Sequence, residues 1–170
     1  YLLPQMLDFY KMAKDKIHGL QFLILRQDAP VGIQKFLDAA GLDNTSVQIK
    51  SAKRAELPAV LEKVSYGIFF YKPTFARKST SPVKLGEMLG MGIPVVCNEG
   101  IGDVDEILSL SGAGILISGF TNEEYSKAIE LVITIKPDKN LARHAAEEHF
   151  SLAQVVEKYK LIYKKLSISY

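Results

Sequence analysis

The residues best suited to chemistry lie where a long loop leads into a helix. Ser79-Thr80-Ser81-Pro82 ends the loop with a hydroxyl at the expected N-cap and proline at the first helical position. The free N–H groups of that first turn, with Lys84 among them and Arg77 and Lys78 upstream, can hold a diphosphate. The same residues also fit an ordinary capped helix with exposed lysines, so further context has to decide between the two interpretations.

Glu87 follows Lys84 by three residues and therefore falls on the same side of the expected helix. One interpretation is a surface ion pair between the two, worth a few tenths of a kcal/mol. In the other, the ionised carboxylate accepts two hydrogen bonds from a vicinal diol such as that of a ribose. Spacing alone does not separate them.

A glycine pair, Gly100-Ile101-Gly102, lies between an apolar run and the next helical pattern. Such a pair lets backbone N–H groups approach an anion or a sugar closely, although a plain tight turn explains it equally well. The nearby carboxylates Asp103, Asp105 and Glu106 suit a helix N-terminus without any catalytic role. We find no candidate for a covalent nucleophile, because Cys97 lies in an apolar run and is expected to be a buried core residue.

Several function classes find no support in the sequence. His18, His144 and His149 have no second ligand at metal spacing, so neither a metal nor another cofactor is expected. There is no Walker sequence, complete GxGxxG or GxSxG. The 21 basic and 19 acidic side chains give a net charge of +2 with no long run of either sign, which argues against a nucleic-acid partner.

Hydropathy periodicity predicts the elements that position these residues. Short apolar runs alternate with amphipathic helical patterns, as in a βαβα chain with parallel strands. The expected strands are Gln21–Arg26, Val47–Lys50, Tyr66–Tyr71, Pro94–Cys97 and Ala113–Ile117. The expected helices are 4–18, one from Asp28-Ala29-Pro30 to just before Gly41, Glu56–Val64, Val83–Met91, Asp103–Ser109, Asn122–Ile135, Lys139–His149 and Ser151–Leu166.

This alternation predicts one α/β domain over residues 1–170, a doubly wound parallel sheet of at least five strands with helices on both faces and extra helices at the C-terminal end. Open parallel sheets bind ligands outside the carboxyl ends of their strands. The site is therefore expected in a cleft formed by two loops, Lys72 to Pro82 after one strand and Asn98 to Asp103 after the next.

The stretch Ser81–Val96 resembles the donor-site signature of the group 1 glycosyltransferases, Ser-Pro-x-Lys-x-x-Glu-x-x-x-x-Gly-x-Pro-Val-Val. The similarity continues before and after it and covers almost the whole chain. It implies the GT-B arrangement of two Rossmann-like domains facing across a cleft, with this chain as the carboxyl-terminal, nucleotide-sugar-binding one. The implied activity is transfer of a sugar from a nucleoside-diphosphate donor to an acceptor hydroxyl with retained configuration, as in polysaccharide biosynthesis.

By the same resemblance, Glu87 corresponds to the glutamate that binds the donor ribose, and Lys84 to a phosphate contact. The turn at Ser81 and Pro82 would lie by the diphosphate and sugar, and Gly100 and Gly102, from the glycine pair above, are further candidates for binding this donor. Many members carry a second glutamate where this chain has Ser79, so the sugar contact it would make is missing or supplied elsewhere.

The family's domain also begins with a strand and a basic diphosphate-binding segment, and this chain starts, at Tyr1, with the helix after them. We therefore expect a fragment without that strand and without the N-terminal domain that would bind a sugar or lipid-linked acceptor, and we expect it to be inactive alone. Two alternatives stay open: a nucleotide-sugar epimerase of the same architecture, and a non-catalytic nucleotide-sensing or receiver-like α/β module. The expected location is cytoplasmic, with a peripheral place at the inner membrane face left open for the parent protein.

Overall fold

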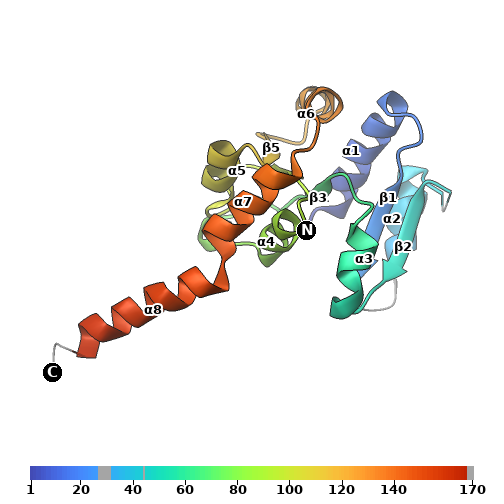
Figure 1. The fold of residues 1–170 in the computed structure, drawn as a ribbon. Coiled ribbons are helices and arrows are strands. Elements are labelled where there is room, and N and C mark those ends of the chain that lie inside the picture. Colours follow the sequence, from blue (N-terminus) through green and yellow to red (C-terminus); the bar gives the residue numbers. More distant parts are fainter. Residues whose placement is uncertain (27–31, 44, 168–170) are drawn as a thin grey trace.

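The computed structural model describes residues 1–26, 32–43 and 45–167. Helices and short strands alternate along this part of the chain, as the periodicity predicted (Figure 1). In order they are α1 (Leu3–Lys16), β1 (Phe22–Arg26), α2 (Ile33–Ala40), β2 (Val47–Ser51), η1 (Arg54–Glu56), α3 (Leu57–Leu61), β3 (Gly67–Phe69), η2 (Phe75–Ser79), α4 (Val83–Gly90), β4 (Val95–Asn98), α5 (Val104–Ser111), β5 (Gly114–Ile117), α6 (Asn122–Thr134), α7 (Lys139–Phe150) and α8 (Leu152–Ser167).

Two predicted elements are clearly shorter in the structure, while the other described elements agree with the prediction to within about two residues at each end. The helix predicted over Glu56–Val64 is a 3-10 turn followed by only five α-helical residues, because Val64 N–H bonds Leu61 O in a tighter i to i−3 turn. The strand predicted over Tyr66–Tyr71 keeps three residues, since the N–H of Tyr71 bonds a side chain instead of a strand carbonyl. The predicted helix start at Asp28-Ala29-Pro30 lies outside the described residues.

The five strands are all parallel but form two sheets, so the prediction of a single sheet of at least five strands was wrong. β1 pairs with β2, with Phe22 opposite Val47. β3, β4 and β5 form the second sheet in that order, with Gly67 opposite Val95 and Val95 opposite Gly114. No hydrogen bonds join β1 to β3, which leaves the two groups of strands as separate sheets.

Helix α1 covers both sheets. Its side chains Met6, Phe9 and Ala13 pack in the cluster that contains Phe70, Val96 and Ile117 of the second sheet and its flanks. Leu7 and Tyr10, on the adjoining face of the same helix, pack with Leu37 and Val47 beside the first sheet. The two sheets thus share one layer of helix.

The opposite layer of the second sheet is built by α4, α5 and α7. Leu85 and Leu89 of α4 pack with Ala142, Ala145 and Ala146 of α7, and all five are buried. Small residues on α7 let the two helices approach closely.

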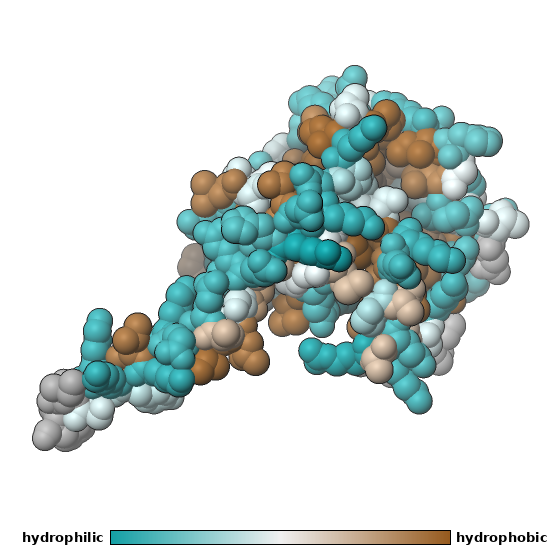
Figure 2. Space-filling view, viewed as in Figure 1, coloured by the Kyte–Doolittle hydropathy of each residue, from teal (hydrophilic) through white to brown (hydrophobic). Residues whose placement is uncertain are grey.

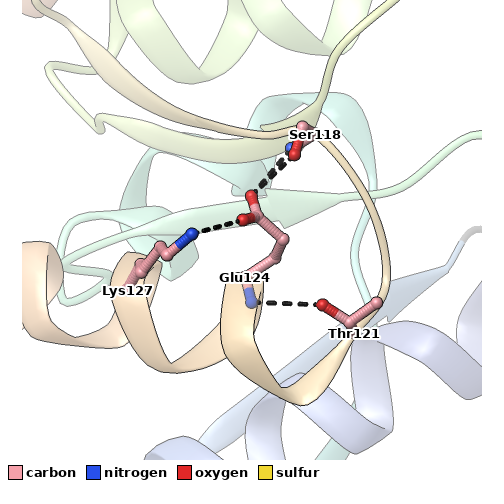
Figure 3. Close-up of polar contacts among 4 residues, drawn as sticks. All are labelled: Ser118, Thr121, Glu124 and Lys127. Carbon is pink, nitrogen blue, oxygen red and sulfur yellow. Dashed lines mark hydrogen bonds and ion pairs between the residues drawn. The ribbon is translucent and has the colours of Figure 1, made fainter.

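Helix α6 has a well-defined amino terminus that ties it to the end of β5 (Figure 3). The N–H of Glu124 donates to Thr121 Oγ1 at 3.3 Å, while its carboxylate accepts from Ser118 Oγ at 2.8 Å and from Lys127 Nζ at 2.9 Å. These bonds, from Lys127 and Ser118, lower the pKa of Glu124 to about 2.

Helix α8 leaves the body of the molecule and extends to the carboxyl end of the described chain (Figure 1). The apolar stripe that its sequence forms is exposed throughout, and brown side chains line the projecting arm in Figure 2. Within the described ranges, no helix is both long and apolar enough to cross a membrane.

Candidate functional site

The loop after β3 delivers the chain to the amino terminus of α4. It first makes a 3-10 turn, η2, and then reaches Pro82, which is the N-cap residue with φ −73° and ψ 115°. The sequence had placed Ser81 in that role, and this prediction was wrong by one residue. No side chain caps α4, so the first N–H groups of the helix are left without a side-chain acceptor.

The hydroxyl of Ser81 is used to join two loops instead. Ser81 Oγ donates to Asp103 Oδ2 at 3.0 Å, which links the loop after β3 to the loop after β4. Gly102 lies against the first loop at φ +51°, and a Cβ on it would overlap the carbonyl oxygen of Thr80. The closest neighbour of Gly102 is therefore protein backbone.

Gly100 has a different environment from Gly102. Its φ is +82° and a Cβ would meet nothing within 4 Å. The N–H of Gly100 donates to the carboxylate of Asp105, at 2.9 Å to Oδ2 and 3.2 Å to Oδ1. Asp105 in the first turn of α5 thus closes the loop, and Gly100 supplies its left-handed turn.

Two cations and two tyrosines surround the start of α4. The rings of Tyr1 and Tyr71 lie 4.6 Å apart, and their hydroxyl oxygens are hydrogen-bonded to each other at 2.8 Å. Lys84 Nζ stands 4.5 Å above the Tyr1 ring, and Arg77 Cζ lies 4.7 Å from the centre of the Tyr71 ring. Cation–π contacts hold both positive groups at the adjoining tyrosine rings, and Lys84 itself belongs to the first turn of α4.

Glu87 is exposed on α4 and forms no ion pair with any described residue, Lys84 included. The surface ion pair considered from the spacing is therefore not made. Its carboxylate lies close enough to Tyr1 to affect that phenol: burial raises the pKa of Tyr1 most, the Tyr71 hydroxyl raises it further, Arg77 lowers it and Glu87 raises it. Glu87 is thus an exposed carboxylate near Tyr1 with no ion-pair partner among the described residues.

Asn98 is a structural member of this site that the sequence analysis missed. It is buried at the end of β4, where its Oδ1 accepts from the N–H of Tyr71 at 2.8 Å and its Nδ2 donates to Glu99 O at 3.1 Å. The side chain stands in for a strand carbonyl and fixes the ends of β3 and β4 together. A polar residue directly after a buried apolar run was the available signal.

The buried cysteine, the possible metal ligands and the surface hollows give no second candidate site among the described residues. Cys97 is fully buried, and desolvation raises the pKa of its thiol well above the ordinary range. In the part of the chain that the structure describes, no group of three or more His, Cys, Asp or Glu side chains could hold a metal ion. One shallow hollow of about 450 Å³ is lined by β2 with Gln34 of α2, and another of about 300 Å³ by α4 and α7 with Ser151; neither is lined by Lys84 or Glu87.

Comparison with known proteins gives a clear answer for the fold. No family model and no curated protein matches the sequence. Among solved structures, AviGT4, a glycosyltransferase involved in avilamycin A biosynthesis, superimposes with a TM-score of 0.69 at 16% identity over 98% of this chain and 48% of that one. WaaG, a glycosyltransferase involved in lipopolysaccharide biosynthesis, gives a TM-score of 0.66 at 16% identity over 88% of this chain and 40% of that one.

The chain is an α/β Rossmann-like domain with additional C-terminal helices, of the fold seen in GT-B glycosyltransferases. It spans about half the length, or less, of these two structural relatives. At this level of identity the likeness establishes a glycosyltransferase-like fold, and the activity has to be argued from the site.

Proposed function

We propose that this chain is the nucleotide-sugar-binding domain of a retaining group 1 glycosyltransferase, which moves a sugar from a nucleoside diphosphate to an acceptor hydroxyl. The observation that carries the proposal is the unpaired carboxylate of Glu87 one turn inside an uncapped helix terminus flanked by two cations. A free acceptor and free donors at adjoining places suit a ligand with a diol at one end and a diphosphate at the other.

In this proposal the amino terminus of α4 binds the diphosphate. The backbone N–H groups after Pro82 point outward with the positive end of the helix dipole, and Lys84 adds a full charge in the first turn. Binding moves Lys84 from the Tyr1 ring to a phosphate oxygen, a short movement for a flexible side chain. Arg77, held over Tyr71, supplies a second cation.

Glu87 would accept hydrogen bonds from the two ribose hydroxyls. The wall next to the diphosphate and sugar would be formed by Ser81, Gly100 and Gly102. The two glycines contribute by allowing the backbone conformation of the loop. The leaving diphosphate is then stabilised electrostatically by the helix terminus and the basic side chains, without a covalent intermediate on this domain. The acceptor would be a sugar or a lipid-linked sugar bound by a partner domain of a longer polypeptide.

Nuclear magnetic resonance titration with nucleoside diphosphates tests this proposal directly. UDP, GDP and ADP would each be added to the 170-residue chain while backbone amide shifts are followed. The proposal expects shifts at Val83, Lys84 and Gly102 with at least one of the three. Amide shifts confined to other surfaces, or none at millimolar nucleotide, would contradict it.

A further inference from the structure

The loop between β3 and α4 presents one large apolar side chain to solvent. Phe75 is 88% exposed, more than any other large apolar side chain among the described residues. Its backbone is fixed by the 3-10 turn η2, in which the N–H of Arg77 donates to Thr74 O at 3.0 Å. The N–H of Thr80 then donates to Arg77 O at 3.1 Å. A hydrogen-bonded turn therefore holds the Phe75 ring outward.

The same turn places a lysine on the side of that ring. A 3-10 helix has three residues per turn, so side chains three positions apart lie on one side of it. Phe75 and Lys78 therefore share a side of η2. Arg77 lies on another side, with its Cζ 4.7 Å from the centre of the Tyr71 ring. Only three residues separate η2 from α4, so this pair of an aromatic ring and an ammonium group lies close to the proposed diphosphate site.

The charge of this segment has one sign. Residues 72–84 include four basic side chains and no acidic one: Lys72, Arg77, Lys78 and Lys84. None of the four forms an ion pair with a described residue. The proposed function assigns Lys84 and Arg77 to the diphosphate and gives Lys78 no partner. An ammonium group donates three hydrogen bonds and accepts none, so a carboxylate is a better partner for it than a sugar hydroxyl is.

We propose that Phe75 and Lys78 form a subsite for an acidic sugar, so that the donor is a nucleoside-diphosphate uronic acid. This inference rests on the proposed function, because it extends the same site from the diphosphate to the sugar. The apolar C–H face of the pyranose ring packs on the Phe75 ring, and the sugar carboxylate accepts from Lys78 Nζ. A neutral sugar suits this segment less well, because its hydroxyl hydrogens need acceptors and residues 72–84 offer no carboxylate.

Sugar phosphates test the subsite without a nucleoside. Glucuronic acid 1-phosphate, glucose 1-phosphate and inorganic phosphate are each titrated into the 170-residue chain while backbone amide shifts are followed by nuclear magnetic resonance. The variants are Phe75→Ala and Lys78→Gln. Lys72→Gln is the matched control for charge, because it removes one lysine from the same loop. Leu110→Ala, at an exposed apolar residue of α5, is the control for the loss of an apolar side chain.

The expected result is that glucuronic acid 1-phosphate binds wild type about threefold or more tighter than glucose 1-phosphate does, as an exposed charge pair allows. Lys78→Gln should remove that preference, whereas Lys72→Gln should keep it. Phe75→Ala should weaken both sugar phosphates and leave inorganic phosphate unchanged, and Leu110→Ala should match wild type. Equal affinities of wild type for the two sugar phosphates, or equal losses in the two lysine variants, would overturn the inference.

Inorganic phosphate separates failure of this subsite from failure of the proposed function. Phosphate should shift the amides of Val83 and Lys84 whatever the sugar is, because it requires only the start of α4. Shifts at these two amides without a preference for the acidic sugar would overturn the subsite alone. The absence of shifts there with all three ligands would contradict both the subsite and the proposed function.

Discussion

Ser81 Oγ and Asp103 Oδ2 are 3.0 Å apart, and this hydrogen bond joins the two loops that follow β3 and β4. Both groups are exposed, so the bond itself contributes little to stability. Its importance is positional: it holds the loop after β4 against the start of α4, where the proposed ligand binds.

A side chain at Gly102 should destabilise the fold more than one at Gly100. Gly102→Ala places a methyl group onto the carbonyl oxygen of Thr80, whereas Gly100→Ala meets open space. Both glycines have positive φ, so each substitution costs about 1–2 kcal/mol in backbone strain. We expect Gly102→Ala to lower the free energy of unfolding by a further ~1–3 kcal/mol, measured by urea denaturation. Equal losses in the two variants would show that the loops do not touch at Gly102.

Stability should depend on Glu124 at acid pH. The folded pKa is lowered to about 2, below the ordinary value of 4.5 for this carboxyl, so the charged form favours the folded state. That stabilisation is fully present above the unfolded pKa and is lost as pH falls from about 4.5 toward 2. We expect Glu124→Gln to lower the melting temperature at pH 6 and to lessen its fall between pH 5 and pH 3.

Glu130→Gln, an exposed position on the same helix, is the control and should change neither quantity. Identical pH profiles for wild type and Glu124→Gln would contradict the bonds drawn in Figure 3.

The isolated chain should transfer no sugar. Transfer requires two substrates held in line and shielded from water, and this chain offers an open surface at the end of one sheet. We expect weak binding of nucleoside diphosphates and no glycosyl product when the purified chain is incubated with nucleotide sugars and simple sugar acceptors. Product formation above the uncatalysed rate, detected by mass spectrometry, would refute this.

The sequence predicted the order of helices and strands because their apolar periodicities are strong and local. It placed Lys84 and Glu87 on one side of α4, and the structure does so as well. It did not predict that β1 and β3 would lie in separate sheets, since strand neighbours are set by tertiary contacts that no local pattern records. The bond between Asn98 and Tyr71 and the ring contact between Lys84 and Tyr1 also escaped, because they join residues far apart in the chain.

The central claim is that Glu87 binds a ribose diol, and a double comparison tests it most directly. Whichever of UDP, GDP or ADP binds best is titrated, beside its 2′,3′-dideoxy analogue, into wild type, Glu87→Ala and the control Glu130→Ala. Two hydrogen bonds to a carboxylate contribute about 1.5–3 kcal/mol each in favourable sites, and about 1.4 kcal/mol is tenfold in affinity. Alanine preserves the helix, so melting temperatures should agree closely. We predict that Glu87→Ala weakens binding of the ribonucleotide by about tenfold or more and leaves that of the dideoxy analogue unchanged. Equal affinities of wild type and Glu87→Ala for the ribonucleotide would contradict the claim and leave Glu87 an ordinary surface residue.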